Sequence, residues 1–315
     1  MKTFFSIALS AVLVAGCGGS QKQGKNMSDL ASGAEAPPDV TPGQKIERQI
    51  SKEARADMAE AVVFLAKQEQ GGLSLAECRE AAGKFREAAE ASDKLIEAYF
   101  NAGVIYQRCP DHKSAEAMYK KALEINPAHA PSLSNLGEIY FRGGNDLVAQ
   151  QYFEQAIKAD SKIVAARNNL AWLLYTKIRA AKDLASVKEI EKEALGQLSR
   201  VLAVDNDNVV AYSIMALVYM QGAEKNKSRL DFAKLLLEEG KKKNDKYAPL
   251  FNAWGLLHML RANVGQALEQ FRRAVELDPT FTEARMNVAQ VVLSFRKYDE
   301  AEEHFSYVLK QKGIS

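Results

Sequence analysis

Three cysteines and four histidines are the side chains of this 315-residue sequence best suited to nucleophilic, redox or metal-ligand chemistry. None of the histidines stands in a metal-ligand spacing such as His-x-x-x-His. The sequence has no Cys-x-x-Cys pair, no phosphate-binding glycine loop and no strand that could form a nucleophile elbow. It therefore predicts no enzyme, no metal site and no cofactor, and leaves the cysteines for anchoring or cross-linking. The residues considered are Cys17, Cys78, Cys109, His112, His129, His258 and His304.

Residues 1–17 have the order of regions that is typical of a targeting segment. Lys2 supplies a positive start, and an apolar run follows that is too short to span a bilayer. The run ends Leu-Val-Ala-Gly-Cys17, which resembles a bacterial lipobox, so the resemblance implies lipidation of Cys17 and a membrane anchor. Because Gly18 and not aspartate follows, the resemblance further implies an outer-membrane lipoprotein that faces the periplasm. The alternatives are an ordinary secretory signal with a chance cysteine, or a retained anchor.

Residues 18–45 are rich in glycine, serine, glutamine and proline and contain almost no large apolar residue. Such a segment cannot bury enough surface to fold, so we expect a disordered tether. Residues 46–315 are predicted to form the folded body.

The body has a strict internal period. Residues 248–281 align with residues 282–315 without a gap, and Ala267 and Ala301 are then equivalent. Ala115 and Ala149 recur at the same spacing. The resulting period of 34 is that of a helix–turn–helix unit, in which small residues mark the helix crossings and large residues fill the layers between them.

This pattern resembles the tetratricopeptide repeat (TPR) family. The resemblance implies an all-α solenoid, a right-handed superhelix of about seven stacked helix pairs; the alternative is a generic helical bundle. Two units break the period: the alanine expected at Asp183 comes at Ala194, and the next comes late at Ala233. We expect lengthened helices at the first break and an inserted stretch near residues 223–232 at the second.

Cys78 and Cys109 form an even pair once Cys17 is set aside. In an oxidising envelope such a pair is a disulfide candidate. By register, Cys78 is near the start of a second helix and Cys109 is in the turn before the next second helix, so stacked repeats would bring them together. The alternative is two separate buried thiols.

The TPR resemblance implies that the first helices line a concave groove for extended or helical partner segments. Aromatic, methionine and asparagine side chains at inward register positions are the candidate contacts, and a ladder of asparagines could hold a peptide main chain. The alternative is that some of them pack between helices. The candidates are Phe100, Asn101, Asn135, Phe141, Asn168, Asn169, Trp172, Tyr175, Met220, Asn252, Met259 and Asn287.

A net charge of +2 gives no concentrated basic face, so no nucleic-acid partner is expected, and no small-molecule substrate is expected either. We expect a lipid-anchored scaffold that binds envelope proteins through its groove. The layout resembles the TPR lipoproteins of myxobacterial gliding-motility complexes. The alternatives are a pilotin-like assembly factor for a type IV pilus secretin, and a regulator of a cell-wall hydrolase.

Overall fold

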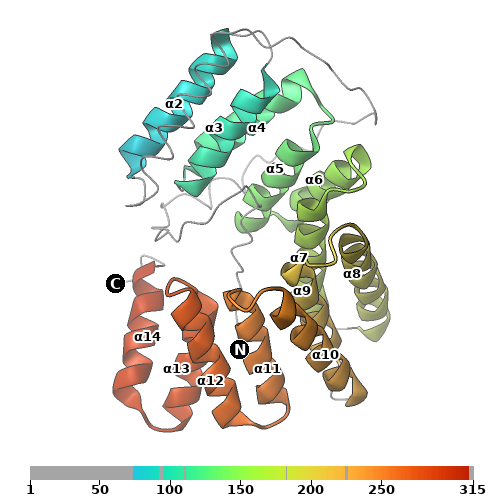
Figure 1. The fold of residues 1–315 in the computed structure, drawn as a ribbon, viewed down its shortest axis with the longest axis vertical. Coiled ribbons are helices and arrows are strands. Elements are labelled where there is room, and N and C mark those ends of the chain that lie inside the picture. The colour runs from blue at the N-terminus through green and yellow to red at the C-terminus, as the bar shows by residue number, and fades with distance from the viewer. Residues whose placement is uncertain (1–73, 92–94, 110, 182, 224–225, 312–315) are drawn as a thin grey trace. The chain divides into compact units, whose positions relative to one another are not determined.

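The structure is a computed structural model that describes residues 74–91, 95–109, 111–181, 183–223 and 226–311. Every regular element among these residues is an α-helix, and none is a strand (Figure 1). The expected all-α fold is confirmed. The predicted signal peptide at 1–17, the tether at 18–45 and the opening helix of the body lie outside the described residues.

The described chain divides into two compact units within helix α7. The N-terminal unit ends at Asn169 and the C-terminal unit begins at Leu170. The N-terminal unit contains α2 (Leu75–Ala91), α3 (Ile96–Arg108), α4 (His112–Ile125), α5 (Ala130–Arg142), α6 (Asp146–Ala159) and the start of α7 (Val164–Ala180). The C-terminal unit contains the rest of α7, α8 (Leu184–Val204), α9 (Val209–Met220), α10 (Ser228–Lys243), α11 (Ala248–Leu260), α12 (Val264–Leu277), α13 (Thr282–Ser294) and α14 (Tyr298–Gln311).

Within each unit, neighbouring helices pack in antiparallel pairs joined by short turns, as in α3 with α4 and α11 with α12. Side-chain caps set where several helices begin. Asp111 accepts a hydrogen bond from the Ser114 N–H, and Asn208 accepts one from the Ala211 N–H. Each cap satisfies one of the amide donors that a helix start leaves unpaired.

The periodic alanines occupy equivalent places. Ala115, Ala149, Ala267 and Ala301 each lie on the second helix of a pair, and none is more than 2% exposed. One period of the sequence therefore corresponds to one helix pair, as predicted.

At three crossings a glycine of the first helix faces an aromatic ring of the second. A methyl group added at Gly103 would lie 2.6 Å from the Tyr119 ring, and one added at Gly137 would lie 2.5 Å from the Phe153 ring. At the equivalent Gly255, the ring is that of Phe271. Small residues were expected at the helix crossings, and at these three crossings the space that a side chain would take is occupied by an aromatic ring of the second helix.

The helices on both sides of the first break in the period, near Asp183, are lengthened as expected. Helix α7 has 17 residues and α8 has 21, against 13 in α5 and 14 in α6. Asp183, which stands where the period required an alanine, caps α8 by accepting a hydrogen bond from the Ser186 N–H. The extra residues therefore continue as helix and do not form a long loop.

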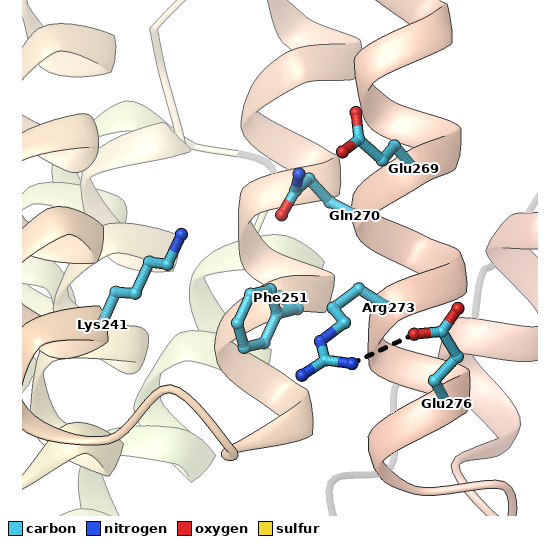
Figure 2. A pocket seen from close by; sticks show the side chains of 6 residues that line it. All are labelled: Lys241, Phe251, Glu269, Gln270, Arg273 and Glu276. Carbon is cyan, nitrogen blue, oxygen red and sulfur yellow. Dashed lines mark hydrogen bonds and ion pairs between the residues drawn. The ribbon is translucent and has the colours of Figure 1, made fainter.

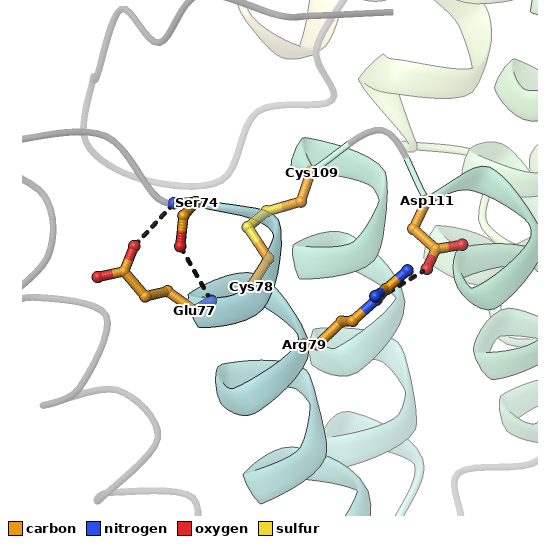
Figure 3. Close-up of a disulfide and its surroundings, with 6 residues drawn as sticks. All are labelled: Ser74, Glu77, Cys78, Arg79, Cys109 and Asp111. Carbon is orange, nitrogen blue, oxygen red and sulfur yellow. Dashed lines mark hydrogen bonds and ion pairs between the residues drawn. A yellow bond between two sulfur atoms is a disulfide. The ribbon is translucent and has the colours of Figure 1, made fainter. Parts of the chain in front are cut away.

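Cys78 and Cys109 are joined by a disulfide, with their Cα atoms 6.1 Å apart (Figure 3). Cys78 lies near the start of α2 and Cys109 is the residue that ends α3. Beside the disulfide, Ser74 and Glu77 form a reciprocal capping box: the Ser74 N–H donates to the Glu77 carboxylate, and the Glu77 N–H donates to the Ser74 hydroxyl. The start of α2 is thus fixed both covalently and by its cap.

Candidate functional site

In the N-terminal unit, Asn135 belongs to an internal hydrogen-bond chain. Its Nδ2 donates to the Tyr119 hydroxyl over 2.9 Å, and that hydroxyl donates to Gln107 Oε1 over 2.8 Å. Asn135 is 4% exposed, and burial raises the pKa of Tyr119 well above its usual range. Asn135 therefore ties α5 to the preceding helix pair, and its amide donor is already used.

The other candidates on α3 and α5 are half-buried. The Phe100 ring packs 5.8 Å from the Tyr119 ring and 5.4 Å from the His129 ring, measured between centroids. Asn101 and Phe141 are likewise only partly accessible. These three keep some surface for a partner while they support the helix packing.

A buried ion pair lies on α5 at the inward register positions. Glu138 is 3% exposed, and its Oε1 accepts hydrogen bonds from Arg142 Nε at 2.9 Å and Arg142 Nη2 at 2.6 Å. The second carboxylate oxygen of Glu138 is buried and has no hydrogen-bond partner. Glu138 stands at an inward register position, although it was not one of the predicted site residues.

In the C-terminal unit, the expected exposed band of aromatic and methionine side chains is not found at Trp172, Tyr175 or Met220. Trp172 and Tyr175 are each 2% exposed with their rings 5.1 Å apart, and Met220 is 4% exposed. Burial also raises the pKa of Tyr175 to about 12. The physical reason is that large rings packed against each other, here tilted by 40°, remove much apolar surface from water, so these residues serve the core.

The asparagine candidates are mostly buried as well. Asn252 is 3% exposed and accepts a hydrogen bond at its Oδ1 from Asn287 Nδ2 over 2.7 Å, so this pair links α11 to α13. Asn168 is 4% exposed and Asn169 is 6% exposed. Asn169 differs from Asn135 and Asn252 because its Nδ2 is buried without a hydrogen-bond partner.

Exposed apolar side chains remain on the first helices of the last two pairs. We name Met259, Leu260 and Leu293 the inner apolar strip; they are 41%, 49% and 43% exposed. Met259 was a predicted contact, whereas Leu260 and Leu293 were missed. Leu293 stands one full period after Met259, and Leu260 is the neighbour of Met259, so the repeat register could have found them. Among the described residues of the first helices, this strip is more exposed than the half-buried Phe100 and Phe141 and is therefore open to an apolar partner surface.

Helices α10, α11 and α12 also enclose a cleft of about 330 Å³ (Figure 2). The Arg273 guanidinium pairs with Glu276 at 3.1 Å and lies 5.9 Å from the Phe251 ring centroid. Two cationic and two anionic side chains line the cleft, so its charge favours no class of ligand. The lining residues are Lys241, Phe251, Glu269, Gln270, Arg273 and Glu276.

Among the described residues, no His, Cys, Asp or Glu side chains group in threes closely enough to hold a metal ion. None of the described helices combines the length and the apolar character needed to cross a bilayer.

Two family profiles described as tetratricopeptide repeat match this chain, over residues 95–162, 135–197 and 252–313. Together they cover more than half of the 315 residues. The chain therefore belongs to the tetratricopeptide repeat family. Arrays of this family are typically binding scaffolds and not enzymes, so protein–protein interaction is the function that the fold supports.

Among solved structures, a tetratricopeptide repeat protein from Parabacteroides merdae is similar, with a TM-score of 0.60, 14% identity, and coverage of 84% of this chain and 94% of that chain. The type IV pilus biogenesis factor PilW is similar with a TM-score of 0.52, 17% identity, and coverage of 71% and 96%. At these identities the likeness shows the fold alone.

Anaphase-promoting complex subunit 3 of Schizosaccharomyces pombe is 25% identical over 142 residues, which are 45% of this chain and 20% of that protein. The chain therefore spans about a fifth of that relative's length.

Proposed function

We propose that this protein is a non-enzymatic scaffold that holds segments of partner proteins against the inner face of its first helices. The observation that carries the proposal is the inner apolar strip, three half-exposed side chains on α11 and α13, of which Met259 and Leu293 are equivalent by register and Leu260 adjoins Met259. Met259, Leu260 and Leu293 offer flexible apolar surface to a helical or extended segment. In protein interfaces a few well-packed anchor residues supply most of the binding free energy.

We place the scaffold in the bacterial envelope, anchored to the outer membrane through acyl chains on Cys17 and facing the periplasm. The sequence pattern that ends at Cys17 supports the anchor. The disulfide between Cys78 and Cys109 supports an oxidising compartment, because such bonds persist in the periplasm and are rare in the cytosol.

Within the envelope we favour a role in assembling a multiprotein machine such as the gliding-motility apparatus, on the layout of anchor, tether and irregular central repeats. The assembly of a type IV pilus secretin is the second candidate. PilW, a pilus biogenesis factor, shares the fold at 17% identity. Regulation of a cell-wall hydrolase is the third.

Capture from cells tests the proposal. Tagged protein is crosslinked in living cells and purified from membranes, and the captured proteins are identified. Motility components, a secretin or a hydrolase would each select one of the three roles. Met259→Asp combined with Leu293→Asp should reduce capture at least about fivefold, since charged groups cannot replace buried apolar anchors.

The matched control is Leu235→Asp on α10, which changes a side chain that is 56% exposed on a second helix. Equal capture by both variants would contradict binding at the inner apolar strip. Separately, Cys17→Ala should move the protein from the membrane to the soluble fraction; continued membrane retention would contradict lipid anchoring.

A further inference from the structure

The turn between α13 and α14, the last described helix pair, has the same backbone as equivalent turns in other pairs (Figure 1). The Lys297 N–H donates to the Val292 carbonyl over 3.0 Å. One period earlier, the Asn263 N–H donates to the His258 carbonyl over 2.9 Å. Such bonds close a helix end on a residue in the left-handed conformation, which here is Arg296 with a φ of 59°.

The side chains of this turn fit that backbone less well than those of an equivalent turn. Arg296 has a positive φ where the turn between α5 and α6 has Gly144, and a residue with a Cβ atom is strained there. Lys297 stands where Asn145 caps α6 by accepting a hydrogen bond from the Val148 N–H, and an ammonium group cannot accept one. Residues that fit a turn poorly point to a role beyond the turn itself.

The turn also exposes two aromatic side chains. Phe295 is 51% exposed and Tyr298 is 63% exposed. The helix pair itself does not require an aromatic residue at position 295, because the equivalent positions hold Gly143 and Arg261. Exposed rings of this size can act as anchors in a protein interface.

Five charged side chains of both signs lie beside these rings along the chain. Two are cationic and precede α14, three are anionic and lie on its first two turns, and all five are exposed. Within the part of the chain that the structure describes, none of the five forms an ion pair. They are Arg296, Lys297, Asp299, Glu302 and Glu303.

We propose that the two rings and these five charged residues, which we name the turn patch, bind a second copy of this chain. A two-fold axis brings the same patch of two copies face to face, so that the cations of each copy meet the anions of the other around the rings. A patch with both signs of charge is complementary to itself. An anionic lipid surface would instead be repelled by its three carboxylates.

The dimer should be weak, because so few residues bury much less area than a standard interface. We expect a dissociation constant on the order of 10–100 µM. The association is independent of the partner segment proposed for the inner apolar strip, since no residue of that strip belongs to the turn patch.

Sedimentation equilibrium of the purified full chain tests the proposal over a range of about 1–300 µM. The wild type should pass from monomer to dimer, and Phe295→Ser should raise the dissociation constant about tenfold or more, since it removes an aromatic anchor. Phe232→Ser is the matched control, because Phe232 is 52% exposed on α10. Its dissociation constant should stay within about twofold of the wild-type value.

Charge exchange tests the pairing itself. Arg296→Glu with Lys297→Glu makes the turn patch anionic, and Glu302→Lys with Glu303→Lys makes it mainly cationic. Each variant alone should be monomeric, because like charges then face each other. An equimolar mixture of the two should regain a dimer, with a dissociation constant within about threefold of the wild-type value.

Three results would each overturn the proposal: a wild-type chain that stays monomeric at about 300 µM, equal dissociation constants for Phe295→Ser and Phe232→Ser, or a mixture of charge variants that stays monomeric. Flotation with phosphatidylglycerol vesicles adds a fourth. Vesicle binding by a monomeric wild type that Phe295→Ser abolishes would assign the turn patch to a membrane. Thermal unfolding of each variant identifies a folding defect; should a charge variant unfold, the comparison of Phe295→Ser with Phe232→Ser carries the test.

Discussion

At three of the close crossings, the first helix contributes a glycine and the second helix lays an aromatic ring on it, as Tyr119 does on Gly103. By register, alanine takes the glycine's place in three other pairs, at Ala171, Ala216 and Ala289. Leucine takes the place of the ring in the first two of these, at Leu198 and Leu237, whereas the third keeps a ring at Phe305. In two of these three pairs a smaller side chain on the second helix therefore accompanies the added methyl group on the first.

The close contact between Gly137 and the Phe153 ring predicts the effect of Gly137→Ala. The new methyl group would meet the Phe153 ring at 2.5 Å, so we expect a loss of about 1–3 kcal/mol in the free energy of unfolding from overpacking. Phe153→Leu alone should also destabilise, by leaving a cavity. The double variant should lose less free energy of unfolding than the sum of the two single losses, by about 1 kcal/mol or more. Urea denaturation of the four proteins measures this, and purely additive losses would contradict it.

His129 makes the N-terminal unit sensitive to acid. Burial lowers its pKa to about 4, with Glu97 opposing the shift. Its unfolded pKa is about 6.5, so the unfolded chain takes up the proton first. Stability is therefore full above about pH 7 and falls as the pH drops from about 6.5 to 4. The melting temperature should decline over that window and decline less in His129→Gln; equal slopes would contradict the assignment.

Some features of these residues could be predicted from the sequence and others could not. The periodic alanines were predictable because spacing alone identifies a crossing. The burial of Trp172 and Tyr175 was not predictable. The sequence pattern is the same whether neighbouring side chains cover an aromatic residue at an inward register position or leave it exposed. The unused oxygen of Glu138 depends on where a single side chain directs two atoms, which no periodicity encodes.

At the scale of the helices, Arg229 joins three elements around the inserted stretch. Its Nε donates to the Tyr219 carbonyl at 2.9 Å, and its Nη2 reaches the Val218 carbonyl at 3.2 Å and Glu191 Oε1 at 3.0 Å. The guanidinium also lies 5.5 Å from the Tyr219 ring centroid. One side chain at the start of α10 thus satisfies the end of α9 and ties both to the lengthened α8.

Arg229→Ala should therefore lower the free energy of unfolding by about 2–4 kcal/mol, because it removes a partly buried ion pair and leaves helix carbonyls unpaired. Arg229→Lys should recover little, since an ammonium cannot reproduce the planar fork. Lys234→Ala is the control: its pair with Glu238 is exposed, and its loss should cost less than about 1 kcal/mol. Equal effects of Arg229→Ala and Lys234→Ala in urea denaturation would refute the role given to Arg229.

The disulfide holds α2, the first described helix, against α3. A cross-link between residues 31 apart should be worth about 2–4 kcal/mol, although the share realised depends on the unfolded chain. Replacing Cys78 and Cys109 by alanine should speed hydrogen exchange throughout α2 and leave α12 unchanged. Unchanged protection of α2 would contradict a clamping role.

Helix lengths were largely predictable, because a displaced alanine in a helix-compatible stretch reports extra helical residues. The contacts of Arg229 were not predictable, since Glu191 lies 38 residues away and the repeat period does not relate the two. Irregular repeats follow local packing, and the sequence period describes only what the repeats share.

For the molecule as a whole, the repeat architecture sets the type of function, and a few side chains set the partner. A crossing residue recurs because every helix pair needs it, so it is informative about fold and not about binding. The inner apolar strip and the unused polar atoms of Glu138 and Asn169 are the departures from that regularity. They are among the places where the described helices differ from a purely structural stack.

The most direct test of the scaffold account places a photo-crosslinking amino acid at Leu260 on the inner apolar strip and, in a second strain, at Leu235 on α10. These residues are 49% and 56% exposed, so both should tolerate the change. The account predicts a discrete covalent adduct with a partner protein from Leu260 in living cells, and none from Leu235. Adducts from Leu235 alone, or the same adducts from both positions, would contradict it.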